Sequence, residues 1–436
     1  MTQQQDLAFD TLKVHAGYDP KEHNFSVQVP IYQTVSYELG DTARVERLLS
    51  FSELGWLYTR ITNPTVHVLE QRLTALEGGT GALAVASGMA AVSYTLLNLA
   101  EGGGRIITTP QLYGGTFDAF DKLLPKYGVS FDFVEDSDNP KAFAAKLRDD
   151  TKAIFVETIS NPNATLVDLE ALAKIAHDAG IPLVVDNTFA TPYQLRPFEH
   201  GADIVVYSAT KGIGGHGAAL GGVIVENGRF SWDNGKFPQF TEKHHLLRDR
   251  KTDVLRSFFD LAPTFAFTLR VRLTHLAYLG AALGPFDAYL LLQGLETLSE
   301  RISKQVTTTK TLIEYLEAHE KVAWVHHPAA KGSKYRELAE KYFPRGTGTV
   351  FSFGFRGTPE QYNKFIDSVR LFSFQANVGD ARSLIINTPK TTHGELTDQE
   401  QAFAGITPDT IRLSIGLEAP KDLIADLEQA FAKAFE

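Results

Sequence analysis

The chain has 436 residues, a formal net charge of −10, and no cysteine. About two or three domains are expected at this length, and the acidic balance argues against a nucleic-acid partner. The absence of cysteine excludes disulfides, thiolate nucleophiles and cysteine metal sites, and no metal site of any kind is expected.

The first stretch, residues 1–65, shows no long periodic segment and is typical of extended and turn structure. It lacks the basic and apolar regions of a secretory signal, and no apolar run in the sequence is long enough to span a bilayer. We therefore expect a cytoplasmic protein without a membrane partner. An arm of this length needs a surface to lie on, and a neighbouring subunit is one possibility.

Residues 66–225 alternate between helical and strand patterns. Helical periodicity covers Val66–Leu76, a second helix follows Ser87, and Asp168 and Gly180 mark the start and end of a third. Short apolar strands separated by helices predict a mostly parallel sheet covered on both faces. The strands expected here are "TKAIFVET", "IPLVVDN" and "ADIVVYS".

One long amphipathic helix is predicted from Pro285 onwards, because leucine, isoleucine and valine recur at spacings of three and four up to Val306. Strands at "TVFSFGF", "SLIIN" and "TIRLSIG" and a helix from Pro420 then predict a smaller α+β domain. The expected organisation is an arm over residues 1–65, a large α/β domain over 66–284 and a C-terminal domain over 285–436.

Charged side chains follow two strands that we expect to be neighbours. Asp186 ends "PLVVD", and Lys211 comes just after "DIVVYS". An isolated aspartate in such a place is usually a cap residue, and an isolated lysine is usually solvated. Ligands of parallel sheets bind at the carboxyl ends of the strands, so the two residues together predict a site at this edge.

The glycines after Lys211 allow one competing interpretation. Gly212, Gly214 and Gly217 satisfy G-x-G-x-x-G, which is the fingerprint of dinucleotide binding when a helix follows it. Here "AALGGVIVENG" follows, and its β-branched residues predict a strand. The segment that follows the glycines therefore favours another kind of site.

A Schiff-base lysine is the better interpretation of this loop. Ser208 and Thr210 supply hydroxyls for a phosphate, and Asp186 supplies a carboxylate for a pyridinium nitrogen. Pyridoxal 5'-phosphate (PLP) needs both of these and an amine held where its pKa can fall, which Lys211 provides. The turn Ser87–Met89 adds backbone amides at the start of a helix.

End to end, the chain resembles the Cys/Met-metabolism family of PLP enzymes. The stretch around its lysine, "DIVVYSATKGIGGHG", follows the family signature of Ser-x-Thr-Lys before Gly-His. Within the family it most resembles the O-acetylhomoserine sulfhydrylases, in its length, its insert with "FPQFTE" and "DARSLIINTPKTTH". Further matching stretches are "YTRITNPTVHVLEQRLTALEGG", "SGMAA", "LYGGTFDAF", "ETISNP", "VVDNTFATP" and "RLSIGLE".

The resemblance implies a fold-type-I PLP transferase and a role for each matching residue. The implied catalytic residues are Lys211, Tyr113 and Asp186. Lys211 would carry the cofactor and move protons, and Asp186 would pair with the ring nitrogen. Tyr113 would stack on the ring and help to deprotonate the incoming amino group. Asn161 would lie near the ring oxygen. Arg412, with Ser383 and Tyr58, would bind the substrate, and a surface pairing of Arg412 with Glu418 is the plainer alternative. The implied phosphate ligands are Ser87, Gly88, Met89, Ser208 and Thr210, with Tyr58 and Arg60 from a neighbouring subunit.

The reaction implied by the resemblance is γ-replacement on O-acetyl-L-homoserine with sulfide or methanethiol, giving homocysteine or methionine. Cystathionine γ-synthase and cystathionine γ-lyase chemistry are the alternatives. Methionine γ-lyase is disfavoured because Gly115 stands in "LYGGT" where that group has "LYGCT". A catalytically silent relative is disfavoured because Lys211 and Asp186 are both present. The family geometry implies a tetramer built from dimers with shared active sites.

Three departures from the family pattern bear on the site. Gly212 replaces an aromatic residue after the lysine and is expected to leave space beside the cofactor. Residues 387–390 read Asn-Thr-Pro-Lys instead of His-Pro-Ala-Ser, which predicts room for a bulkier or more anionic ester. Gly104 replaces a common aspartate.

Overall fold

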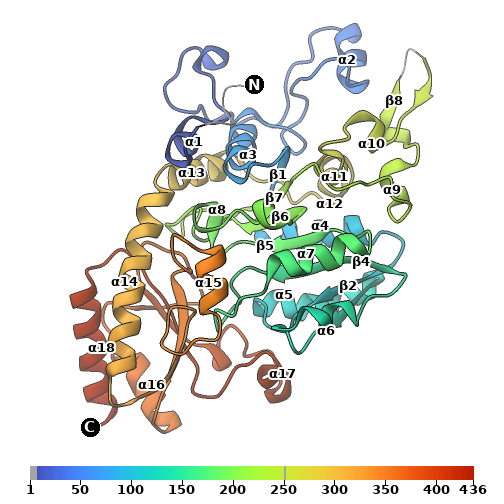
Figure 1. Ribbon diagram of the computed structural model, residues 1–436. Helices are drawn as coiled ribbons and strands as arrows, with labels where there is room; N and C mark the ends of the chain where they lie inside the picture. The colour runs from blue at the N-terminus through green and yellow to red at the C-terminus, as the bar shows by residue number, and fades with distance from the viewer. Residues whose placement is uncertain (1–6, 250–251) are drawn as a thin grey trace.

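The large domain is built on a seven-stranded sheet with the order β1-β7-β6-β5-β4-β2-β3 (Figure 1). The computed structural model describes residues 7–249 and 252–436. β2 to β6 run parallel to one another, whereas β7 is antiparallel to both β1 and β6. The predicted mostly parallel sheet is thus confirmed. Its strands are β1 (Gly81–Val85), β2 (Gly104–Thr108), β3 (Val129–Phe133), β4 (Thr151–Glu157), β5 (Leu183–Asp186), β6 (Ile204–Ser208) and β7 (Gly222–Glu226).

Helices cover both faces of this sheet, which explains why its central strands are apolar throughout. α4 (Gly88–Leu99) packs against β6 and β7, and α7 (Leu169–Asp178) packs against β4 and β5. In Figure 1, α7 lies in front of the sheet and α4 behind it. The predicted cap of α7 is confirmed, because Asp168 accepts a hydrogen bond from the Ala171 amide at 3.3 Å.

The strand predicted after the glycine loop is β7, so the helix that a dinucleotide fingerprint requires is absent at this place. The helix predicted over 66–76 is α3 (Pro64–Glu77), which begins after Asn63 and ends at Gly78 in a left-handed conformation. The remaining short α-helices of the large domain are α5 (Gly114–Asp118), α6 (Pro140–Ala144), α8 (Thr191–Gln194), α9 (Pro238–Thr241), α10 (Phe258–Leu261), α11 (Ala266–Val271) and α12 (Ala277–Leu279). Two further strands, β8 (Arg248–Asp249) and β9 (Val254–Leu255), pair as a small antiparallel hairpin.

The prediction of a single long helix from Pro285 onwards is wrong at one residue. The structure has α13 (Pro285–Glu296) and α14 (Leu298–Ala318), with Thr297 between them outside helical geometry. A continuous helix would bond the Gly294 carbonyl to the Leu298 amide. Instead, Arg301 Nη2 donates to that carbonyl at 2.6 Å and Arg301 Nε donates to Thr297 Oγ1 at 3.3 Å. These side-chain bonds favour the break.

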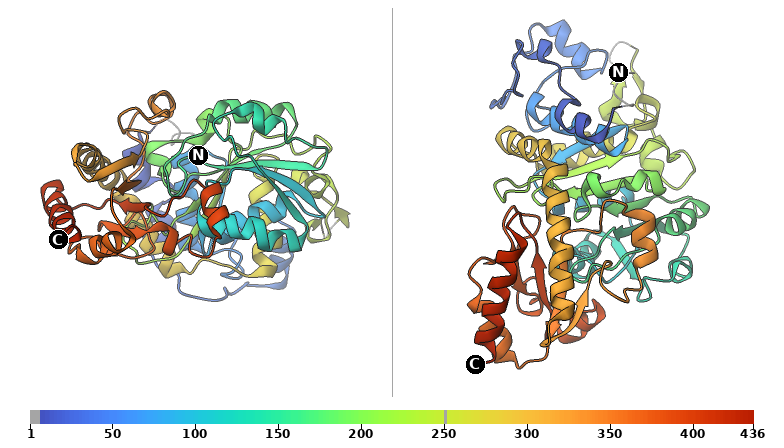
Figure 2. Two further views of the ribbon diagram at one scale, coloured as in Figure 1. Left: turned by 90° about the horizontal axis from the view of Figure 1, so that it is seen from below. Right: turned by 60° about the vertical axis from the view of Figure 1, so that its left-hand side comes forward.

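α14 runs from the large domain to the C-terminal domain, where a separate five-stranded sheet has the order β10-β11-β14-β13-β12 (Figure 2). The core of the large domain continues into α14 as far as Val306, and the C-terminal core begins at Leu312. The domain ranges expected above stay a prediction. The elements are β10 (Val322–His326), α15 (Arg336–Tyr342), β11 (Val350–Phe355), α16 (Pro359–Ser368), β12 (Ser373–Phe374), β13 (Leu384–Asn387), α17 (Asp398–Phe403), β14 (Ile411–Ser414) and α18 (Pro420–Ala434).

Within residues 7–65, the N-terminal arm is mostly extended and turn structure with two short α-helices, α1 (Phe9–His15) and α2 (Thr42–Leu49), and a 3-10 helix over Pro20–His23. α1 packs against α3 and α13, and Lys13 Nζ donates to Ser299 Oγ at 2.5 Å. The first part of the arm therefore lies on its own chain. No helix in the described ranges combines the length and apolar character needed to cross a membrane.

Candidate active site

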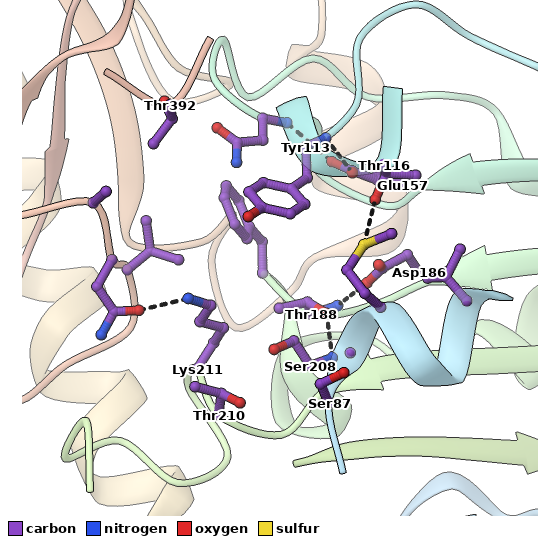
Figure 3. A pocket seen from close by; sticks show the side chains of 18 of the residues that line it. Ser87, Tyr113, Thr116, Glu157, Asp186, Thr188, Ser208, Thr210, Lys211 and Thr392 are labelled. Carbon is purple, nitrogen blue, oxygen red and sulfur yellow. Dashed lines mark hydrogen bonds between the residues drawn. The ribbon is translucent and has the colours of Figure 1, made fainter. Parts of the chain in front are cut away.

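A cavity of about 220 Å3 opens where β4, β5 and β6 end, and the C-terminal domain closes its other side (Figure 3). Parallel strands present their carboxyl ends at this edge, as the sequence pattern predicts. Figure 3 shows Lys211, Tyr113 and Asp186 around the same hollow. The predicted site residues that line it are Ser87, Gly88, Met89, Tyr113, Asn161, Asp186, Ser208, Thr210, Lys211 and Arg412.

Lys211 sits on a tight turn directly after β6. The turn is held by backbone bonds from the Lys211 amide to Ser208 O at 3.1 Å and from the Gly215 amide to Lys211 O at 2.8 Å. Lys211 Nζ donates to Asn377 Oδ1 at 2.6 Å. Burial, together with the charge of Arg412, lowers the pKa of the Lys211 amine to about 8. Part of the amine is therefore uncharged near neutral pH and can act as a nucleophile.

Asp186 ends β5, next to the strand that leads to Lys211. Its Oδ1 accepts from the Thr188 amide at 2.9 Å, and Thr188 Oγ1 in turn accepts from the Ser208 amide at 2.8 Å. Burial raises the pKa of Asp186 to about 6. A cationic partner in the cavity would restore full ionisation, so the carboxylate suits a protonated ring nitrogen.

The start of α4 forms an anion cradle at the cavity. Ser87 Oγ caps the helix by accepting from the Ala90 amide at 3.1 Å, which leaves the Gly88 and Met89 amides at the cavity. A Cβ on Gly88 would lie 2.6 Å from Ser208 Cβ, so only glycine lets the helix start touch Ser208. Thr210 Oγ1, held by the Gly221 amide at 3.0 Å, adds a second hydroxyl.

Arg412 comes from β14 and is buried, with 3% of its surface exposed. Its Nη1 donates to Asn161 Oδ1 at 2.9 Å and its Nη2 to Asn377 O at 3.3 Å. Burial lowers the pKa of the guanidinium to about 10, so it stays charged. Both acceptors are neutral amides, which leaves the cation available for an anionic ligand. The alternative surface pairing with Glu418 is wrong.

Three predicted residues lie outside this cavity. Ser383 Oγ donates to Glu418 Oε2 at 2.8 Å and accepts from the Gly416 amide at 2.9 Å. Tyr58 and Arg60 line a separate hollow beside Pro285, with the Arg60 guanidinium 5.5 Å from the centre of the Tyr58 ring. The roles of Ser383 and Tyr58 in substrate binding stay predictions. So do the roles of Tyr58 and Arg60 in binding the phosphate at the active site of a neighbouring subunit.

Two expectations about the departures from the family pattern need correction. The space expected beside Gly212 is filled, since a Cβ there would lie 2.8 Å from Thr191 Cγ2. Lys390 is exposed, and its Nζ donates to Asn363 Oδ1 at 3.3 Å. None of residues 387–390 lines the described cavity, because only Thr392 in this loop reaches it.

The chemistry of these donors fits PLP. The cavity offers an amine at Lys211, a carboxylate at Asp186, an anion cradle at the start of α4 and an aromatic ring at Tyr113. These groups would hold the aldehyde, ring nitrogen, phosphate and ring face of the cofactor.

Apart from Ala376 and the larger apolar residues, five further residues line the cavity that the sequence does not single out: Thr116, Glu157, Thr188, Asn377 and Thr392. Glu157 ends β4 and Thr188 follows Asp186, so the strand-end rule that found Asp186 would also have found them. Asn377 and Thr392 lie on loops of the C-terminal domain. No local pattern marks those two, because only the docking of the domains brings them to the cavity.

Comparisons with known proteins agree with this geometry. The family described as Cys/Met metabolism PLP-dependent enzyme matches residues 10–432. The chain is 43% identical over 424 residues to the O-acetyl-L-homoserine sulfhydrylase of Leptospira meyeri, covering 97% of this chain and 96% of the relative. It is 44% identical over 432 residues to the homocysteine synthase of Schizosaccharomyces pombe, covering 98% of each. A Campylobacter jejuni crystal structure with N'-pyridoxyl-lysine-5'-monophosphate matches with a TM-score of 0.91 at 37% identity, over 98% of this chain and 100% of that one. The chain belongs to the Cys/Met metabolism family of PLP-dependent enzymes.

Proposed function

We propose that this enzyme catalyses γ-replacement on O-acetyl-L-homoserine, in which sulfide displaces acetate and L-homocysteine forms. With methanethiol the product is methionine. The observation that carries the proposal is Asn377, which contacts both Lys211 and Arg412. An amino acid whose carboxylate meets Arg412 therefore has its amino group close to Lys211. The acetyl ester and sulfide are supported by the relatives that are an O-acetyl-L-homoserine sulfhydrylase and a homocysteine synthase.

Each cavity residue has a defined part in this proposal. PLP, when bound, would supply an electron sink that lets a proton leave the α-carbon of the substrate and then the β-carbon. Lys211, with a pKa of about 8, removes and returns those protons near neutral pH. Arg412 orients the substrate by its carboxylate, for which a guanidinium fork is well shaped. Asp186 keeps the ring nitrogen protonated.

The test is a substrate matrix. Purified enzyme is incubated with O-acetylhomoserine, O-succinylhomoserine or cystathionine, each with and without sulfide, and homocysteine and ammonia are measured. Homocysteine formed fastest from the acetyl ester, and only with sulfide, is the expected result. Ammonia released rapidly from cystathionine without a thiol would instead identify a γ-lyase. Cystathionine formed when cysteine replaces sulfide, at a higher rate than homocysteine, would identify a γ-synthase.

We further infer a homo-oligomer, a tetramer built from dimers that share active sites. Tyr58 and Arg60 lie outside the cavity of their own chain, on an arm with exposed apolar side chains. Phe25 is 75% exposed, Val27 88% and Leu54 89%, which suits a surface covered by another subunit. The cytoplasmic setting expected from the sequence stays a prediction.

A further inference from the structure

Glu157 is a buried carboxylate at the cavity for which the proposed reaction has no use. It ends β4, is 8% exposed and pairs in register with Asp186 on β5. Burial and the nearby charge of Asp186 raise the pKa of Glu157 well above its usual value. An ionisable side chain in such a place costs stability, so its retention needs a reason.

The contacts of Glu157 supply that reason. Its Oε1 accepts from the Tyr113 amide at 2.7 Å, and its Oε2 accepts from the Asn161 amide at 3.0 Å. Tyr113 precedes the first turn of α5, and Asn161 lies in the loop after β4. One carboxylate therefore fixes the backbone of two loops that approach the cavity from different elements (Figure 3).

Each of those loops leads to a different part of the site. The side chain of Tyr113 faces the hollow that contains Lys211, whereas Asn161 Oδ1 accepts from Arg412 Nη1 at 2.9 Å. A displaced Tyr113 amide moves the aromatic ring, and a displaced Asn161 amide moves the acceptor that orients the guanidinium. The hydrogen bonds of Glu157 with these two residues are to their backbone amides.

We propose that Glu157 is a positioning residue whose two oxygens set both the Tyr113 ring over the cofactor and the Asn161–Arg412 pair that receives the substrate carboxylate. The substrate half of this inference rests on the proposed function. The cofactor half needs only bound PLP.

The test compares Glu157→Gln with Glu226→Gln in the PLP-loaded enzyme. A glutamine has one acceptor oxygen and an NH2 group that cannot accept a hydrogen bond, so the two backbone amides compete for that oxygen and neither loop is held as before. Glu226 is also buried at the end of a strand, but it accepts from Thr268 and does not line the cavity. It is therefore a matched control for losing a buried carboxyl.

Two measurements test the cofactor half and the substrate half of the inference separately. Visible circular dichroism of the bound PLP, measured without substrate, should change in Glu157→Gln because the aromatic neighbour has moved. The KM for O-acetylhomoserine should rise about tenfold, the order expected when a buried amide loses its hydrogen-bond partner. Glu226→Gln should leave both unchanged. In an Asn161→Ala background, Glu157→Gln should still alter the dichroism but no longer raise KM.

An unchanged dichroism and KM in Glu157→Gln would overturn the inference, and a KM effect that persists in Asn161→Ala would overturn its substrate half. If the wild type does not use O-acetylhomoserine, the proposed function fails, while the dichroism still tests Glu157. Should Glu157→Gln not fold, Glu157→Asp keeps the charge but is one methylene too short to reach both amides. It is expected to change the same readouts, and unchanged values would again overturn the inference.

Discussion

At the scale of single residues, burial shifts the pKa values of the basic groups and of the carboxyl groups of the cavity in opposite directions. It lowers the pKa of Lys211 to about 8 and raises that of Asp186 to about 6. Both changes follow from the same cost, because a poorly hydrated cavity disfavours every charged form. Groups poised in this way near neutral pH are typical of active sites.

The rate at which apoenzyme captures PLP should therefore depend on pH through Lys211. The amine is protonated below its pKa and reactive above it. The capture rate should rise through about pH 8 and then level off, whereas an ordinary lysine with a pKa of 10.5 would keep rising. Visible absorbance after mixing apoenzyme with PLP measures this rate.

Arg412→Met gives a second check, because the charge of Arg412 contributes to the lowered pKa of Lys211. The midpoint should move to higher pH in this variant. A wild-type midpoint near 10 would contradict the buried position of the amine.

Asp186→Asn should leave PLP bound but slow turnover by about 100-fold or more, because an amide cannot hold the ring nitrogen in its protonated form. The oxygen of the introduced amide can still accept from the Thr188 amide, so the fold of the turn should persist. PLP content by absorbance and kcat for homocysteine formation are the measurements. Turnover close to wild type would show that another group protonates the ring.

At the scale of secondary structure, the site depends on how closely α4 approaches β6. Gly88→Ala would place a Cβ 2.6 Å from Ser208 Cβ and push the helix start away from the strand. The overpacking costs about 1.4 kcal/mol and should weaken PLP binding by about tenfold. The Kd for PLP, from quenching of protein fluorescence, measures the effect.

Gly104→Ala is the matched control for this prediction. A Cβ at this position would lie 2.6 Å from Cγ of Lys152, so the variant is also overpacked. Gly104 does not line the cavity. PLP affinity should stay at the wild-type value. Equal weakening in both variants would show a general loss of stability instead of a damaged phosphate cradle.

At the scale of the whole molecule, the arm lies on the far side of the large domain from the C-terminal domain (Figure 2). If its Tyr58 and Arg60 serve a neighbouring subunit, each active site needs two chains. Arg60→Ala and Lys211→Ala should each be inactive alone. Mixed under conditions of subunit exchange, they should recover up to about a quarter of wild-type activity, since each hybrid dimer holds one intact site.

Homocysteine formation in the exchanged mixture checks this prediction, with native mass spectrometry to establish that hybrids form. Mixed wild-type and Lys211→Ala subunits give the activity scale. Proven hybrids without activity would mean that Arg60 serves its own chain.

The sequence by itself determined the sheet, the cap of α7 at Asp168, and the carboxyl edge that carries Asp186 and Lys211. These features depend on neighbours along the chain, through hydrophobic period, capping and the direction of parallel strands. Only the tertiary structure decided the break at Thr297, the filled space beside Gly212 and the presence of Asn377 and Thr392 at the cavity. Those outcomes depend on contacts between residues far apart in sequence, such as Arg301 with the Gly212 carbonyl and Lys211 with Asn377 across the two domains. Spacing along the chain carries no signal for such contacts, because they form only when separately folded elements pack together.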